Sequence, residues 1–376
     1  MVRATRGVRR STGTFQVLVS CDSMAIHDKR GAGPCYRPVN IPESQSNRTQ
    51  NRRGAKSSVS IAIYGPQTLG HYKDPAGTQR EQYRQLKKKS DSSVEFLTLC
   101  SLTHEEAWTF YYACYLPSVG YPLANSYFTE AQLQNIQRKA MSSIIARCGY
   151  NRNTKRAIIY GPLEYGGGNF RRLYDQQGIG QVHLFMQHWR QQTTAGKLLK
   201  CAVEWAQYCI GTSIPFLEDV TTNLPHFESK WLKSLREYLA HINAGLQVNT
   251  PGVASLERHN DTFIMDRVLE AEKFTNREIQ RINYCRLYLG ALTLADLATT
   301  SGDRLDQAKL AGNPSLVSTV PKWMRVHQHK PSDDTWKLWK QANALWSLPD
   351  GTLTQTLGPW LLPNADSRIS HLAYAT

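Results

Sequence analysis

The sequence predicts a mainly α protein, a helical bundle with a few short strands and a disordered basic N-terminal arm. Three observations support this fold class. The capping-box pattern, Thr followed three residues later by Glu or Gln, occurs at Thr103, Thr129 and Thr275, each time before an apolar run. Apolar residues after the boxes recur at intervals of three and four, as on one face of a helix. Evidence for strands is thin, and two short runs are the better candidates.

The arm comprises residues 1–58. Residues 1–56 hold eleven Lys or Arg against three acidic residues, in a segment rich in Ser, Gly, Pro and Asn. Such a composition buries too little apolar surface to fold, so we expect disorder. Two interpretations stay open: an arm that binds nucleic acid or directs nuclear import, or a solvated tail or wrongly joined piece of a gene model.

Helical segments follow in order. The first helix begins after Thr103 and should end at Pro117, the second runs from Thr129 to a stop at Gly149, and another begins after Thr275. The residues expected to face the core are Trp108, Tyr111, Cys114 and Tyr115, then Leu133, Ile136, Ala140 and Ile144, then Leu198, Ala202, Ala206 and Cys209, then Trp231, Leu235, Leu239 and Ile242.

The two strand candidates are "SVSIAIYG" near residue 60 and "AIIYG" near residue 160, and both end at Tyr-Gly-Pro. Two matches of three residues do not make a repeat. The chain of 376 residues has room for two or three domains. We expect one helical domain over 59–250 and a C-terminal helical region over 251–376.

The charge of the chain points to polyanionic partners. A formal net charge of +15 and a pI near 9.5 favour nucleic acid first and an anionic membrane surface second. The sequence has no apolar run of the roughly 18 to 20 residues that a membrane span needs, and no apolar signal-peptide core near its start. We therefore expect an intracellular protein, nuclear or cytoplasmic, without a membrane partner.

The cysteines and histidines give little sign of a metal site. The eight cysteines lack a Cys-x-x-Cys pair and lie in helical segments, which favours reduced core thiols. The close pair His327 and His329 stands in a polar stretch without a nearby cysteine, whereas zinc needs three or four ligands. We expect neither a metal nor a cofactor.

The stretch from Tyr150 to Gly178, "YNRNTKRAIIYGPLEYGGGNFRRLYDQQG", joins basic residues to a triple glycine. It lacks the Gly-Lys-Ser/Thr of a phosphate-binding NTPase loop and the Gly-x-Gly-x-x-Gly of a dinucleotide site. A flexible turn remains, with glycines at positive φ before a helix that begins near Phe170.

Four quoted blocks together resemble a known family. They are "YKDPAGTQREQYRQLKKKSD", "LTHEEAWTFYYACYLPSVGYPL", "LQNIQRKAMSSIIARCGYNRNTKRAIIYGPLEYGGGNFRRLYDQQG" and "INYCRLYLGALTLADLATTSGD". They look like the region downstream of the catalytic palm in reverse transcriptases of LINE-like, non-LTR retroelements. The resemblance covers about residues 67–310, more weakly the stretch from Thr335 to Trp360, and its specific part is the long third block. It implies a thumb-like and connection-like helical fold. Lys155 departs from the family, which carries Pro there.

The resemblance also implies that the catalytic carboxylates of the palm are missing from this sequence. Reverse transcription needs palm carboxylates that hold two Mg²⁺ ions, in an Asp-Asp turn between apolar strands upstream of the thumb. The sequence has a single Asp-Asp pair, Asp333–Asp334, which follows the thumb-like region and lacks apolar flanks, so we interpret it as a solvated helix start before Trp336. Residues 1–60 are too short for fingers and palm. We therefore expect no polymerase activity from this chain alone.

The candidate nucleic-acid contacts are basic residues interleaved with aromatic ones. They are Arg84, Lys87, Lys88 and Lys89, then Arg152, Lys155 and Arg156, then Arg171 and Arg172. For the lysine run, a solvated helix face is the competing interpretation. Cations beside a glycine turn offer side chains and free backbone N–H groups to a phosphate, and we expect the last five cations to reach one groove.

Two functions follow from these patterns. The first is a retroelement-derived fragment that binds RNA or DNA with low sequence specificity and lacks catalysis. The alternative is a helical protein-interaction module whose charge serves solubility and which has no nucleic-acid role.

Overall fold

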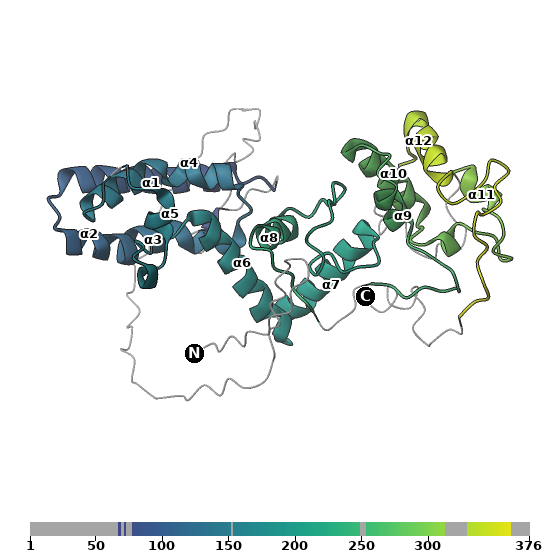
Figure 1. The fold of residues 1–376 in the computed structure, drawn as a ribbon, viewed down its shortest axis with the longest axis horizontal. Helices are drawn as coiled ribbons and strands as arrows, with labels where there is room; N and C mark the ends of the chain where they lie inside the picture. The colour runs from purple at the N-terminus through teal and green to yellow at the C-terminus, as the bar shows by residue number, and fades with distance from the viewer. Residues whose placement is uncertain are drawn as a thin grey trace, which may run out of the picture.

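The computed structural model describes residues 67–68, 71–72, 77–151, 153–248, 253–312 and 329–361. This part of the chain is mainly α, as the sequence predicts (Figure 1). Its buried apolar residues form three clusters along the chain, which we call the first, second and third core clusters. They involve residues 86–173, 185–246 and 264–357. The boundary expected near residue 250 falls in 249–252, outside the described residues, between the second and third core clusters.

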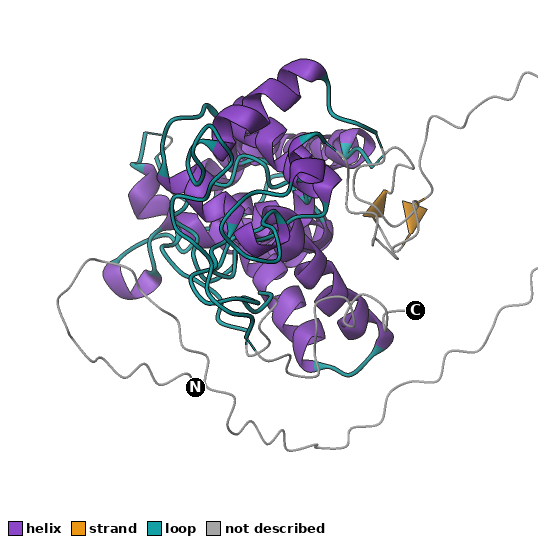
Figure 2. Ribbon diagram, turned by 90° about the vertical axis from the view of Figure 1, so that its right-hand side faces the viewer, coloured by secondary structure: helices purple, strands orange, loops and turns teal. Residues whose placement is uncertain are grey.

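The first core cluster lies among the N-terminal helices. Helices α1 and α4 pack side by side, and the Ser90 hydroxyl of α1 donates a hydrogen bond of 2.8 Å to the Ile136 carbonyl of α4. A two-stranded antiparallel ribbon precedes α1 and lies at the edge of the helical body (orange in Figure 2). The elements are β1 (Gln67–Thr68), β2 (His71–Tyr72), α1 (Arg80–Leu99), α2 (His104–Phe110), η1 (Tyr111–Tyr115), α3 (Leu116–Gly120), η2 (Tyr121–Asn125), α4 (Glu130–Arg147), α5 (Arg156–Tyr160) and η3 (Leu163–Tyr165).

All three predicted capping boxes are present. At the start of α4, the Thr129 side chain accepts from the Gln132 N–H and the Gln132 side chain accepts from the Thr129 N–H, at 3.3 and 2.9 Å. Thr103 and Thr275 make the same reciprocal pairs with Glu106 and Glu278. The four residues expected on the core face of α4 are buried, and Gly149 takes a φ of +87° just after the helix. These helix starts are confirmed.

The expected stop at Pro117 is wrong. The chain passes from α2 through a π-helical turn, η1, into α3, and Pro117 occupies the first turn of α3. The Leu116 N–H still donates to the Tyr111 carbonyl, so the helical path continues up to the proline, and the proline follows directly on the wider π-helical turn. The wider turn also shifts the register of the side chains: Tyr111 and Tyr115 are buried, whereas Cys114 points to solvent.

Helix α6 connects the first two core clusters (Figure 1). Its first residue, Leu173, belongs to the first cluster and Phe185 to the second. In between, Gln177 and Gln181 are buried and donate to the Ser234 hydroxyl of α8 and to backbone carbonyls at Phe128 and Ser126. The elements of this region are α6 (Leu173–Arg190), α7 (Thr194–Ile210) and α8 (Lys230–His241).

The expected core faces of α7 and α8 are correct only in part. Leu235 and Leu239 are buried, but Ile242, which caps α8, is exposed. On α7, Ala206 is buried, while Leu198 and Ala202 face solvent. The helix packs through the neighbouring stripe that contains Val203 and Ile210. The six described cysteines are free thiols, two of them buried and two exposed, so the expectation of core thiols is wrong for the exposed pair, Cys114 and Cys201.

The third core cluster is formed by α9 (Ile264–Glu270), α10 (Asn276–Leu289), η4 (Leu294–Asp296), α11 (Gln307–Leu310) and α12 (Asp333–Asn343). Helices α10 and α12 pack together, with Trp339 and Trp346 buried. Asp333 and Asp334 are exposed in the first turn of α12, which Ser332 caps by accepting from the Thr335 N–H. The interpretation of this acidic pair as a solvated helix start is confirmed.

The strand expected near residue 160 is wrong. Residues 156–160 form the short helix α5, in which the Ile158 and Ile159 N–H groups donate to the Lys155 carbonyl. Ile159 points into the first core cluster and Ile158 to solvent. A strand needs a neighbour to satisfy its backbone, and the adjacent glycine segment folds back on α5 without forming a ladder. The other strand candidate and the basic arm lie outside the described residues.

Candidate nucleic-acid interface

Residues 155–172 form a compact hairpin, in which α5 and η3 are followed by the triple glycine. Its returning arm is tied to its outgoing arm by backbone hydrogen bonds. Gly168 N–H donates to the Ile158 carbonyl and Asn169 N–H to the Gly161 carbonyl, both at 2.7 Å. Gly167 and Phe170 donate to the carbonyls of Pro162 and Ile159 at 2.9 and 3.0 Å. The Phe170 ring stacks on Trp108 at 4.6 Å, which anchors the hairpin to the first core cluster.

The glycines serve the packing of this hairpin. A Cβ on Gly167 would lie 2.2 Å from the carbonyl carbon and oxygen of Gly161, so no larger residue fits without moving backbone. Of the three glycines, only Gly166 takes a positive φ, +74°. The helix after the hairpin begins at Leu173, slightly later than expected. For the glycine turn itself the expectation of free N–H groups is wrong, because the N–H groups from Gly166 to Arg171 all donate within the protein.

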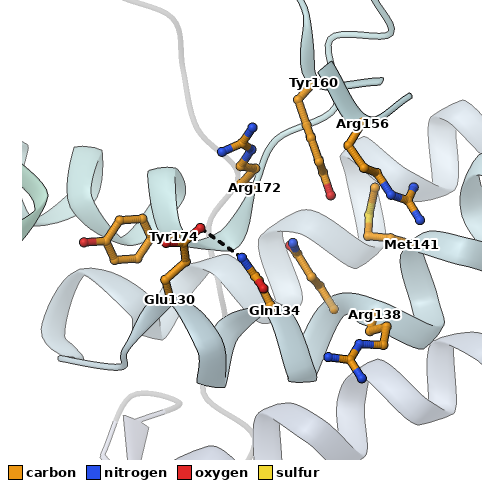
Figure 3. A pocket seen from close by; sticks show the side chains of 9 residues that line it. Glu130, Gln134, Arg138, Met141, Arg156, Tyr160, Arg172 and Tyr174 are labelled. Carbon is orange, nitrogen blue, oxygen red and sulfur yellow. Dashed lines mark hydrogen bonds between the residues drawn. The ribbon is translucent and has the colours of Figure 1, made fainter. Parts of the chain in front are cut away.

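A groove of about 420 Å³ lies between this hairpin, α4 and the start of α6 (Figure 3). Helix α4 contributes two stripes with a spacing of four residues, which places their side chains along one face of the helix. The residues that line the groove are Glu130, Gln134, Gln137, Arg138 and Met141 of α4, Arg156 and Tyr160 of α5, and Arg172 and Tyr174 at the start of α6.

Three arginines from three segments of the chain line the groove. Arg138 and Arg156 are exposed, and Arg172 is half-buried with its guanidinium 5.1 Å from the centre of the Tyr160 ring. Within the described ranges, none of the three lies within 4.0 Å of a carboxylate oxygen or donates a hydrogen bond. Their charges are therefore available to an anionic ligand from solvent.

The two tyrosines of the groove stand in different electrostatic surroundings. Burial raises the pKa of Tyr160, the nearby charges of Arg156 and Arg172 oppose that shift, and the charge of Asp175 adds to it. Burial also raises the pKa of Tyr174, but there the nearby charges, from Glu237, Glu130 and Asp175, act in the same direction. The end of the groove at Tyr160 is therefore basic and the end at Tyr174 acidic.

Two of the nine predicted contact residues, Arg156 and Arg172, line this groove. Lys155 and Arg171 are exposed on the same hairpin but are not part of the groove lining, and Arg152 lies outside the described residues. The expectation that five cations of this stretch share one groove is therefore wrong. Adjacent residues of the hairpin present their side chains to different sides, so one cation of the pair Lys155 and Arg156 and one of the pair Arg171 and Arg172 line the groove.

The other four predicted contacts lie on α1, away from the groove. Arg84 pairs with Glu81 at 3.0 Å, and the Lys89 ammonium donates to the Ser118 carbonyl at 3.3 Å. Lys88 is exposed and Lys87 half-buried. This distribution fits a solvated helix face as well as it fits a binding surface, so both interpretations of the lysine run stay open.

Arg138 is the groove cation that was not predicted from the sequence. It follows Glu130 and Gln134 at successive intervals of four, on the side of α4 away from Leu133 and Ile136. This polar stripe is visible in the sequence, but only the fold places it opposite Arg156 and Arg172.

Other kinds of site find little support in the described part of the chain. It holds no group of three or more His, Cys, Asp or Glu side chains positioned to bind a metal ion. Among its helices, none combines the length and apolar character needed to cross a bilayer. No family model, curated protein or solved structure matches this chain.

Proposed function

We propose that this protein binds nucleic acid with little sequence specificity through the groove between α4, α5 and α6, and that it lacks polymerase activity of its own. The observation that carries the proposal is that Arg138, Arg156 and Arg172 line one groove without carboxylate partners among the described residues, with Arg172 over the Tyr160 ring. The three arginines outnumber Glu130, the one carboxylate in the lining, so the groove attracts anionic phosphate groups. Arginines bind phosphates, and an adjacent aromatic ring can stack on a base.

The likeness to reverse transcriptases of LINE-like retroelements supports the same proposal. In that family the region downstream of the palm holds template and primer while the palm carries out the chemistry. The sequence offers no Asp-Asp pair between apolar strands, and Asp333 and Asp334 lie exposed at the start of α12. A binding function without catalysis is consistent with both observations.

Salt-dependent binding tests the proposal. Fluorescence anisotropy with a labelled single-stranded oligonucleotide should give a log–log dependence of affinity on salt, and its slope should decrease by roughly 0.7 for each phosphate that the protein no longer binds. Replacing Arg138, Arg156 and Arg172 by Gln should therefore flatten the slope by about 2 and weaken binding equally for different sequences.

A matched control variant distinguishes the effect of the groove arginines from the effect of net charge. Lys273, Arg277 and Arg281 are exposed near and on α10, and replacing these three by Gln removes the same charge at a distance from the groove. This variant should keep the slope of the wild-type protein within about 0.7, the value of a single phosphate contact. If both triple variants reduce the slope equally, the groove is not the binding site.

One observation favours the alternative of a protein-interaction module. The hairpin exposes three large apolar side chains, Ile158, Leu163 and Tyr165, the last with 85% of its surface accessible. Clustered apolar side chains of this kind often mark contacts with another protein. Under this alternative, nucleic-acid binding is absent at low salt, and sedimentation velocity detects self-association that Leu163→Ser and Tyr165→Ser abolish.

A further inference from the structure

The groove has two chemically different ends. Figure 3 shows Tyr174 and Glu130 at one end and Arg156, Arg138 and Met141 at the other. Glu130 and Arg138 belong to the same helix and are eight residues apart, which corresponds to about 12 Å along the axis of α4. Asp175 and Glu237 add negative charge near Tyr174. A continuous polyanion that followed the whole groove would bring a phosphate against Glu130, where like charges repel.

A ligand that fits this polarity is anionic at one end and rich in hydrogen-bond donors at the other. A nucleotide with its phosphate at the arginines and its base toward Tyr174 has that arrangement. A groove of about 420 Å³ is of the size that holds a small ligand. A base within a duplex is stacked and paired, so it could enter only after leaving the helix.

Glu130 is the group that can read the base. One carboxylate oxygen, Oε1, accepts from the Gln134 side-chain amide at 2.9 Å, and Oε2 has no hydrogen-bond partner among the described residues. An ionised carboxylate only accepts hydrogen bonds, and it pairs with exocyclic amino groups such as N4 of cytosine. Thymine and uracil carry carbonyl oxygens in place of that amino group, and these oxygens repel a carboxylate.

We propose that the groove takes one unpaired nucleotide of a single strand, with its phosphate and the neighbouring phosphates on the arginines and the amino group of its base on Glu130, and thereby prefers cytosine over thymine or uracil. This inference rests on the proposed function, because it assumes that nucleic acid enters the groove. It adds two properties, a preference for single strands over duplex and a limited preference among bases.

Binding of oligo-dC and oligo-dT of equal length tests the base preference, by anisotropy at pH 7.5 and one salt concentration. The wild-type protein should bind oligo-dC about 5- to 10-fold more tightly, the effect of one good hydrogen bond to a charged acceptor. Glu130→Gln should reduce this ratio to below about twofold, because glutamine offers the base a donor as well as an acceptor. A duplex of mixed sequence should bind more weakly than either single strand.

The control variant is Glu164→Gln. It makes the same charge change on an exposed residue of the hairpin that packs beside α4, and Glu164 is not part of the groove lining. It should leave the dC-to-dT ratio unchanged, and an equal effect of both variants would overturn the role of Glu130. Equal affinity for oligo-dC and oligo-dT, or a duplex bound as tightly as a single strand, overturns this inference. If either result comes with a salt slope that still depends on the groove arginines, the proposed function survives. If replacing the three arginines leaves the affinity and the salt slope unchanged, both this inference and the proposed function are wrong.

Discussion

A substitution at Gly167 gives the sharpest test of the hairpin in the candidate site. Replacing Gly167 by Ala places a methyl group 2.2 Å from the carbonyl carbon and oxygen of Gly161. Both atoms belong to the backbone of the same hairpin, so the contact is relieved only when the two arms separate. Separation stretches the hydrogen bonds from Gly168 to Ile158 and from Asn169 to Gly161, each 2.7 Å long in the structure.

The cost follows from these contacts. Overpacking a well-packed site costs about 1–3 kcal/mol, and each weakened hydrogen bond adds up to about 1 kcal/mol. We expect the free energy of hairpin opening to fall by about 2–3 kcal/mol. Since about 1.4 kcal/mol corresponds to a factor of ten, amide hydrogens of residues 168–170 should exchange with solvent about 30- to 150-fold faster.

The adjacent glycine provides the control. Gly166 has a φ of +74°, but a Cβ at this position would have no neighbouring atom within 4 Å, and asparagine tolerates this backbone conformation. Gly166→Asn should change the exchange rates by less than about threefold. Hydrogen exchange followed by mass spectrometry on peptides that cover residues 158–172 makes the comparison. Exchange in Gly167→Ala that matches Gly166→Asn would refute the close backbone approach.

Three further outcomes are expected. Burial lowers the pKa of His226 to about 4, so the unfolded chain binds the proton more readily. Urea unfolding should therefore show stability falling by about 3 kcal/mol from pH 6.5 to pH 4, and His226→Gln, which keeps a donor toward the Ile210 carbonyl, should remove most of this dependence. Arg286→Ala leaves the carbonyls of Tyr208 and Cys209 without their donor in a buried site, and should lower the free energy of unfolding by about 3–5 kcal/mol, against less than about 0.5 for the exposed Arg277→Ala. Primer extension on poly-rA/oligo-dT with Mg²⁺ or Mn²⁺ should give background only, and incorporation that disappears with Asp333→Asn would contradict the absence of catalysis.

Features that depend on near neighbours in the chain were predictable from the sequence. Each capping box joins residues three positions apart, so Thr129 and Gln132 reveal the start of α4 without knowledge of the rest of the fold. The buried face of α4 follows from the same local periodicity. The helix at Asp333 is another case, because Ser332 and two acidic residues form a favourable first turn by themselves.

Features that depend on distant partners were not predictable. "AIIYG" has the composition of a strand, yet its backbone is satisfied within α5 and by the glycine arm that folds over it. Which stripe of α7 is buried depends on how α7 packs against α6, and so Leu198 and Ala202 were misplaced. Arg138 becomes a site residue only when α4 faces the hairpin.

The net charge of the chain is a poor guide to its binding surface, because several of its cations are occupied inside the protein. Arg236, Arg258 and Arg286 are buried and donate to backbone carbonyls rather than to carboxylates. Such guanidiniums fix loops and cannot release counterions from a bound polyanion. Arg138, Arg156 and Arg172 have the same side chain but no carboxylate or hydrogen-bond partner among the described residues, and they share one groove. The affinity for a polyanion should therefore depend on these three positions more strongly than on an equal number of charges elsewhere. For this reason the two triple variants, which remove equal charge, distinguish a specific binding groove from an effect of net positive charge.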